Sequence, residues 1–253
     1  MKMTIAPLIT VAALVAASSA QAQFTEVDIS SQANDDIQTY TDGGNYQVGG
    51  TTLTVAGVPF GLAEVDGTSG TTGVVQSSAH GGAPGPFDFT FSVPAGTQAT
   101  ALYSLANTAW GSAGYDVGSI VVTGTGGETA TLTLTEGDNI RDHNNDGYVN
   151  TLTDPTVVPT YFQNGAPTTD GYIQTRLDMQ TLDLPSTFDG DTIATIDFEG
   201  YAQGGNGSAF VAGLTLSDAA VPDSPLPLPL IAGMFLAMLA TAGIRQNQVR
   251  RPV

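Results

Sequence analysis

The stretch of the chain richest in potential metal ligands is RDHNNDGYVNTLTD, residues 141–154. Calcium takes about six to eight oxygen ligands, and a glycine inside a calcium-binding loop permits the sharp turn that they require. The pattern D-x-N-x-D-G is present here, with Gly147 at the turn. The predicted calcium ligands are the side chains of Asp142, Asn144, Asp146 and Asn150 and the backbone carbonyl of Tyr148.

The end of this loop departs from the helix–loop–helix calcium motif. Thr153 stands at the twelfth position, where a carboxylate is expected, so Asp154 or Asp138 would have to complete the shell. The flanking segments TATLTLTE and DPTVVPTYF are typical of strands. Two interpretations stay open: a calcium loop between β-elements, or a turn whose Asn and Asp side chains hydrogen-bond to their own backbone.

Side chains suited to nucleophilic or acid–base catalysis are few. The chain has no Cys, no G-x-S-x-G elbow, and only two His residues, His80 and His143. His80 lies in SSAHGGAPGPF, which is typical of a solvated loop. A glycosidase needs a defined carboxylate pair, and no pair stands out among 24 acidic residues. The sequence therefore favours a protein that is not an enzyme, with a glycan hydrolase as the least favoured alternative.

Aromatic residues beside loops are candidates for glycan binding. Trp110, the only Trp, lies in NTAWGSAGYD, and Tyr115 follows five residues later. An aromatic ring on a loop can stack on a sugar, whereas a buried ring stabilises the core of a sandwich. A glycan-binding site at Trp110 and Tyr115 and a core role for Trp110 both stay open.

The charge of the chain is strongly acidic, with a formal net charge of −18. All acidic residues lie between Glu26 and Asp223, and this stretch has only two basic residues, Arg141 and Arg176. Such a charge repels nucleic acid and anionic lipid and attracts divalent cations. Without Cys there is no disulfide scaffold. Arg141 is expected to pair with a nearby carboxylate, which is Asp138, Asp142 or Glu136.

The N-terminus has the pattern of a secretory signal peptide. Residues 1–22 begin with a basic Lys2, continue with an apolar run over residues 5–17, and end in the small-residue site Ala20-Gln21-Ala22. Cleavage there would make Gln23 the first residue of the mature chain. The alternative is an N-terminal membrane anchor, for which the apolar run is short.

The C-terminus has three parts: a Pro-rich break, an uncharged apolar run over residues 230–244, and a basic tail. These 15 residues would span about 22 Å as a helix, less than the ~30 Å hydrocarbon core of a bilayer. We nevertheless expect a transmembrane helix here. Its basic tail would lie on the cytoplasmic side and the acidic domain outside.

This tripartite end resembles the PEP-CTERM sorting signals of Gram-negative bacteria, and most closely their VPLPA-CTERM variant. The matching residues lie within 222–253 and are Pro225, Leu226, Pro227, Leu228 and Pro229, followed by Arg245, Arg250 and Arg251. The sequence SPLPLP replaces the usual motif, and the arginines are spread out. The resemblance implies an exosortase-type membrane protease as a partner and a host that makes an extracellular polysaccharide. The alternative is a plain C-terminal membrane anchor.

The body of the chain, residues 23–221, is predicted to be one extracytoplasmic domain. Short runs such as FDFTFSV, ETATLTLTE and TIATIDFEGY alternate apolar and polar residues between Gly-, Asp- and Asn-rich turns. This period of two, with one solvent-exposed face, indicates an antiparallel β-sandwich, and a jelly roll is the expected topology. Over residues 27–142 the chain also resembles galactose-binding-like jelly rolls, through VDISSQAND, VGGTTLTVAGVPFGL, NTAWGSAG and TLTEGDNIRD.

Together these patterns predict an exported cell-surface or exopolysaccharide-matrix protein with a structural or adhesive role. The alternative is a carbohydrate-binding module on the cell surface, in keeping with the galactose-binding-like resemblance. Calcium is the one cofactor that the sequence suggests.

Overall fold

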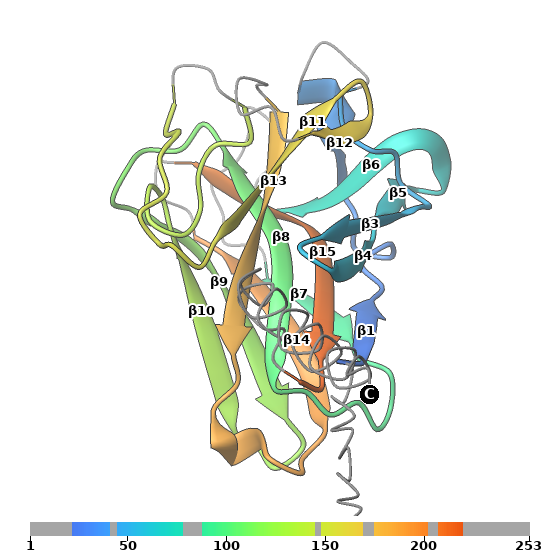
Figure 1. The fold of residues 1–253 in the computed structure, drawn as a ribbon, viewed down its shortest axis with the longest axis vertical. Coiled ribbons are helices and arrows are strands. Elements are labelled where there is room, and N and C mark those ends of the chain that lie inside the picture. The colour runs from blue at the N-terminus through green and yellow to red at the C-terminus, as the bar shows by residue number, and fades with distance from the viewer. Residues whose placement is uncertain are drawn as a thin grey trace, which may run out of the picture.

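The computed structural model describes residues 22–40, 45–77, 88–144, 148–168, 175–201 and 207–219. Within these residues the chain forms fifteen β-strands and two short 3-10 helices (Figure 1). In chain order the elements are β1 (Phe24–Val27), β2 (Asp35–Asp36), η1 (Ile37–Tyr40), β3 (Thr52–Val55), β4 (Val58–Gly61), β5 (Ala63–Val65), β6 (Thr68–Gln76), β7 (Asp88–Ser92), β8 (Ala101–Ala109), β9 (Asp116–Gly124), β10 (Thr129–Thr135), β11 (Val158–Gln163), β12 (Ala166–Thr168), β13 (Thr175–Asp183), η2 (Ser186–Phe188), β14 (Ile193–Gly200) and β15 (Ser208–Ser217). The predicted all-β fold is confirmed.

Two antiparallel sheets form a β-sandwich-like arrangement (Figure 1). The larger sheet has the order β12-β11-β13-β8-β15-β6-β2, with β1 added to β15 and β5 added to β6. The smaller sheet has the order β10-β9-β14-β7, and β3 and β4 form a separate hairpin. Strands β8 and β15 pair from Ser208↔Ala109 to Ser217↔Ala101 and form the centre of the larger sheet.

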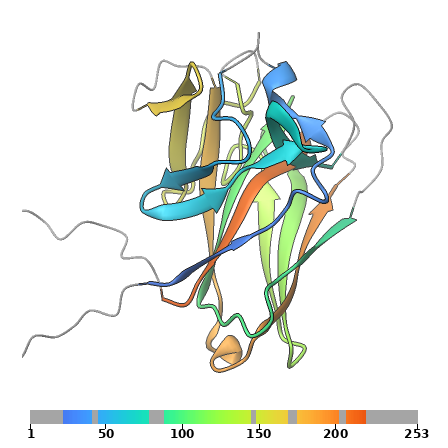
Figure 2. The ribbon, with the colours of Figure 1, turned by 90° about the vertical axis from the view of Figure 1, so that its right-hand side faces the viewer.

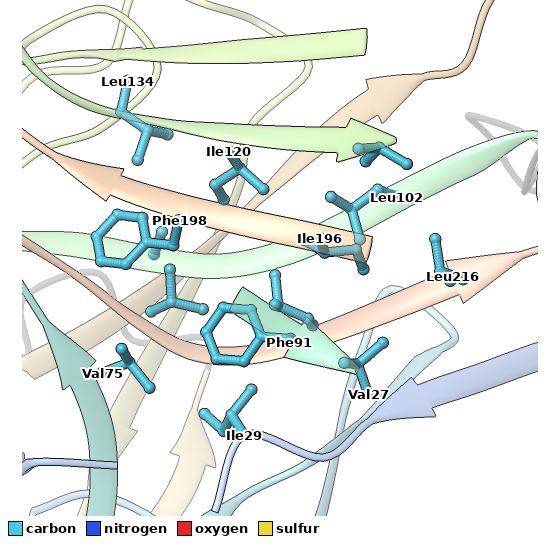
Figure 3. Packing of buried hydrophobic residues seen from close by; sticks show 14 of the residues in the cluster. Val27, Ile29, Val75, Phe91, Leu102, Ile120, Leu134, Ile196, Phe198 and Leu216 are labelled. Carbon is cyan, nitrogen blue, oxygen red and sulfur yellow. The ribbon is translucent and has the colours of Figure 1, made fainter. Parts of the chain in front are cut away.

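The main hydrophobic core lies between the two sheets (Figure 3). Phe91 and Phe198 come from the smaller sheet, and Leu102 and Leu216 come from the larger one. All four side chains are buried. Alternate residues of a strand point to the same side of its sheet, and these four lie on the sides that face the other sheet. Burial of each such side chain stabilises the fold by about 1.5–3 kcal/mol.

A second hydrophobic cluster involves the hairpin β3–β4 and residues of the larger sheet. Phe60 on β4 belongs to it together with Leu105 on β8 and Phe210 on β15. Because the larger sheet contributes to both clusters, every residue of β8 and β15 is buried. The expectation of one solvent-exposed face is therefore wrong for these central strands, and it holds better for the smaller sheet.

The smaller sheet tests the predicted alternation most directly. Phe91 is buried on β7 and Leu134 on β10, as the period of two predicts. On β14, strict alternation over TIATIDFEGY puts Ala194 on the same face as Ile196 and Phe198, which is wrong, because Ala194 is exposed while the other two are buried. A bulge between Ile193 and Thr195 shifts the register and puts Ile193 in the buried position.

The two ends of the described domain lie together, at the far end of the sandwich from Trp110. Phe24 pairs with Ser217, and the Gln23 backbone N–H donates a hydrogen bond to Asp218 Oδ1 at 2.7 Å. The start of β1 and the end of β15 accordingly lie side by side (Figure 2). β8 begins at this end and leads to Trp110 at the other. The distance from the first to the ninth residue of β8 is about 26 Å, since each step along a strand adds roughly 3.3 Å.

Several predicted segments lie outside the described residues. These are the signal peptide up to residue 21, which includes Ala20, and the whole sorting segment 222–253. No helix in the described part of the chain is long and apolar enough to cross a membrane.

Candidate functional site

The loop that contains the predicted calcium ligands begins as part of the larger sheet. Strands β8 and β13 pair from Ala101↔Asp183 only as far as Leu105↔Met179. Beyond that point residues 141–144 lie between them. Thr108 N–H donates to the Arg141 carbonyl at 2.9 Å, and His143 N–H donates to the Thr108 carbonyl at 2.8 Å. On the other side Arg176 N–H donates to the His143 carbonyl at 3.0 Å, so the segment bridges two strands that have separated.

Arg141 makes a buried ion pair with Asp178. Its Nε and one terminal nitrogen donate to the two carboxylate oxygens at 2.7 and 2.9 Å, with side-chain exposures of 8% and 0%. Asn107 donates a further hydrogen bond to Asp178 at 2.9 Å. The prediction that Arg141 pairs with a carboxylate close in sequence is therefore wrong. Strand β13 instead brings Asp178, which is 37 residues away in the sequence, against the guanidinium.

Arg176 donates hydrogen bonds to oxygen atoms of the same loop. Its Nε donates to the Asp142 carbonyl at 2.8 Å, and a terminal nitrogen donates to the Asn144 carbonyl at 3.4 Å and to the Asn150 side-chain oxygen. Arg141 adds a hydrogen bond to the Asn150 carbonyl at 2.9 Å. Both arginines of the acidic body are thus buried and engaged with this loop, where they supply positive charge.

Two predicted calcium ligands, Asp142 and Asp154, make the hydrogen bonds of Asx turns. Asp142 Oδ1 accepts from Asn144 N–H at 2.7 Å, and Asp154 Oδ1 accepts from Thr156 N–H at 2.8 Å. These residue i to i+2 contacts are the self-bonded turn of the second interpretation. Asp142 Oδ2 also accepts the backbone N–H of Trp110 at 2.7 Å, so this buried carboxylate ties two loops together.

The remaining predicted ligands in the described residues also have hydrogen-bond partners within the protein. Asp138 accepts a hydrogen bond from the Thr153 hydroxyl, and the Tyr148 carbonyl accepts one from the Asn150 amide at 3.1 Å. Asp146 lies outside the described residues, as does Gly147. Among the residues that the structure describes, no three His, Cys, Asp or Glu side chains gather into a metal-binding group. Calcium binding by the whole predicted set stays a prediction.

Glu136 is the functional candidate whose ligand potential the sequence did not reveal. It is 1% exposed, and its Oε1 accepts a hydrogen bond from the Thr108 hydroxyl at 2.9 Å. Its Oε2 is buried and has no hydrogen-bond partner. Burial, with the nearby Asp142 carboxylate adding to it, raises the pKa of Glu136 from 4.5 to about 8. In the sequence, the one signal for this burial is the position of Glu136 directly after the Thr-rich strand β10.

His143 is buried in an aromatic environment and stays neutral. Its Nδ1 lies 2.7 Å from the Tyr46 hydroxyl, and its ring makes edge contact with Phe210 at 5.8 Å between centroids. Burial, together with the positive charge of Arg176, lowers the pKa of His143 to about 4. A side chain enclosed in this way has a packing role. His80 lies outside the described residues.

Trp110 is half-buried and has a left-handed backbone, with φ at 61°. That conformation is costly for a bulky residue, and the hydrogen bond to Asp142 helps to hold it. The indole makes an edge contact with Tyr40 at 5.8 Å between centroids. It therefore neither lies fully in the core nor stands free on the surface, so both predicted roles stay open.

Tyr115 and Tyr148 are each 45% exposed and belong to loops at the Trp110 end of the sandwich. Glu136 N–H donates to the Tyr115 carbonyl at 2.9 Å, which fixes one loop. Asp142 N–H donates to the Val149 carbonyl at 3.0 Å, which fixes the other. The buried carboxylate residues thus hold the backbone of the two loops that carry these rings.

Comparison with protein-family models, with curated proteins and with solved structures finds no match to this chain.

Proposed function

We propose that this chain is an exported, acidic surface protein with a structural or adhesive role in the cell envelope or exopolysaccharide matrix. The observation that carries the proposal is the position of the two ends. The predicted mature N-terminus at Gln23 and the strand that leads to the C-terminal tail lie side by side. The Trp110 loops lie at the other end of β8. A domain held by its C-terminal helix would present these loops away from the membrane.

The ionisable side chains at the loop end are buried and hydrogen-bonded within the protein, which supports a role without catalysis. His143, Arg141 and Asp178 are buried. Arg141 and Asp178 form an ion pair, and His143 lies against the Tyr46 hydroxyl, so these side chains stabilise the loop end of the fold. Within this proposal the fold is a jelly roll of the galactose-binding-like kind. An exosortase-type protease recognises the tail at residues 222–253.

Fractionation of cells tests export and anchoring. We expect the mature protein to begin at Gln23 and to stay with the envelope. Deletion of residues 222–253 should release it into the medium, whereas a chain with only the body substitution Asp183→Asn should fractionate like the parent. Detection of intact Met1 in exported material, or unchanged fractionation of the deletion, would contradict the proposal.

A second candidate function is carbohydrate binding at the loop end. The observation that favours it is Tyr115, which is 45% exposed in the same loop as Trp110. We expect Tyr115→Ala and Trp110→Ala to reduce binding to polysaccharide from the host. The matched control is Val48→Ala, which removes an exposed apolar side chain from a different loop. Equal binding by all three variants would exclude this site.

A further inference from the structure

We propose that Glu136, Asp142 and Asn144 form a site for a hard divalent cation, calcium being the best match. This site differs from the predicted loop set because its second carboxylate is Glu136, directly after β10, and not Asp146, Asp154 or Asp138. It goes beyond the proposed surface role, which does not require it.

Two oxygen atoms without hydrogen-bond partners point to a ligand. In the described part of the chain, Glu136 Oε2 and Asn144 Oδ1 are buried side-chain acceptors that no donor reaches. Glu136 itself is 1% exposed. A buried acceptor without a partner is costly, and a bound ion is one arrangement that satisfies it.

Hydrogen bonds connect the Asp142 carboxylate to the backbone of Asn144 and to the residue that precedes the glycine against Glu136. Its Oδ1 accepts the backbone N–H of Asn144 at 2.7 Å, so the two residues adjoin. Its Oδ2 accepts the N–H of Trp110, and the next residue, Gly111, lies directly against the Glu136 carboxyl group. A Cβ atom at Gly111 would stand 1.9 Å from Glu136 Oε1, so the glycine makes room for this carboxyl.

The chemistry of the three residues suits calcium. Two carboxylates match the charge of a divalent cation, and an amide oxygen is a common third ligand. Arg141 and Asp178 neutralise each other nearby. Arg176 takes the Asn150 side-chain oxygen and the carbonyls of Asp142 and Asn144, so those oxygens are not assigned to the ion.

The positive charge of Arg176 also weakens cation binding. We therefore expect a dissociation constant of roughly 10⁻⁴ to 10⁻³ M, the range of extracellular calcium modules.

Terbium luminescence tests the site on the full chain solubilised from the envelope. Trp110 is the only Trp and bonds to Asp142, so Tb³⁺ at this site should emit when Trp110 is excited. Calcium chloride should displace it at millimolar concentration. Glu136→Gln should weaken binding by about tenfold or more, and Asn144→Asp should tighten it by roughly tenfold because it adds a charge. Asp154→Asn and Asp183→Asn should change nothing.

The outcomes separate the alternatives. Absence of Trp-sensitised emission would overturn the proposal, as would unchanged affinity in a folded Glu136→Gln chain. Loss of binding in Asp154→Asn alone would also overturn it and would favour the predicted loop set in which Asp154 completes the shell. Circular dichroism shows whether Glu136→Gln folds. If it does not, Asn144→Asp and Asn144→Ala decide, since they must respectively tighten and weaken binding. None of these results bears on fractionation of the deletion at residues 222–253.

Discussion

The buried ion pair between Arg141 and Asp178 gives the most quantitative expectation. Replacement of Asp178 by Asn keeps the shape of the side chain but leaves the Arg141 guanidinium without its counter-charge. Asp178 is 0% exposed and accepts hydrogen bonds from two guanidinium nitrogens and from Asn107. Removing one partner of a buried pair costs about 3–5 kcal/mol, because an uncompensated charge stays in the interior. Domains are stable by about 5–15 kcal/mol, so the variant should lose a large part of its stability.

Urea unfolding followed by Trp110 fluorescence measures this loss, since Trp110 bonds to the adjoining loop. The matched control is Asp138→Asn, which changes the exposed one of the three carboxylates that the sequence offered as partners of Arg141. Its effect should be below about 1 kcal/mol. The double variant Arg141→Met with Asp178→Leu removes both charges. It should be closer to the parent chain than the sum of the single variants predicts.

Two results would show that the ion pair does not stabilise the fold in this way. One is a loss of less than about 1 kcal/mol in Asp178→Asn, which would mean that water or another group compensates Arg141. The other is a double variant whose loss equals the sum of the single losses, which would mean that the two side chains are not energetically coupled.

Three further expectations concern the same end of the sandwich. Because the pKa of Glu136 is raised from 4.5 to about 8, its contribution to stability is full below pH 4.5 and is lost as the pH rises through 8. Measured in EDTA, the free energy of unfolding should fall by up to about 1.4 kcal/mol per pH unit in that interval. The Glu136→Gln variant should lack this pH dependence, whereas Asp183→Asn should keep it. The pKa of His143 is lowered from 6.5 to about 4, so its contribution is full above pH 6.5 and is lost as the pH falls through 4; His143→Gln should flatten that acid limb of the stability profile. Gly111→Ala should destabilise the chain by about 1–3 kcal/mol in thermal melts, because its methyl group meets Glu136, and the same substitution should cost less when combined with Glu136→Ala; equal costs would contradict the contact.

Local chemistry in the sequence determined the β-character of this protein. Alternation of apolar and polar residues placed Phe91 and Leu134 in the core, because the side-chain period of a strand is fixed by backbone geometry. Glycine and asparagine at turns are equally local. The alternation did not predict the bulge at Ala194, because an extra residue in one strand depends on how that strand pairs with its neighbour.

The polar interior was decided by tertiary structure alone. On β13 the alternation of Arg176, Asp178 and Gln180 with Leu177 and Met179 is typical of one solvent-exposed face, yet all five are buried. The larger sheet is covered on both sides, and the segment 141–144 enters where β8 and β13 separate. From proximity in the sequence, the ion-pair partner of Arg141 was predicted to be a carboxylate close to it in the chain. Its actual partner lies 37 residues away, because a salt bridge depends on distance in space and strand register sets that distance.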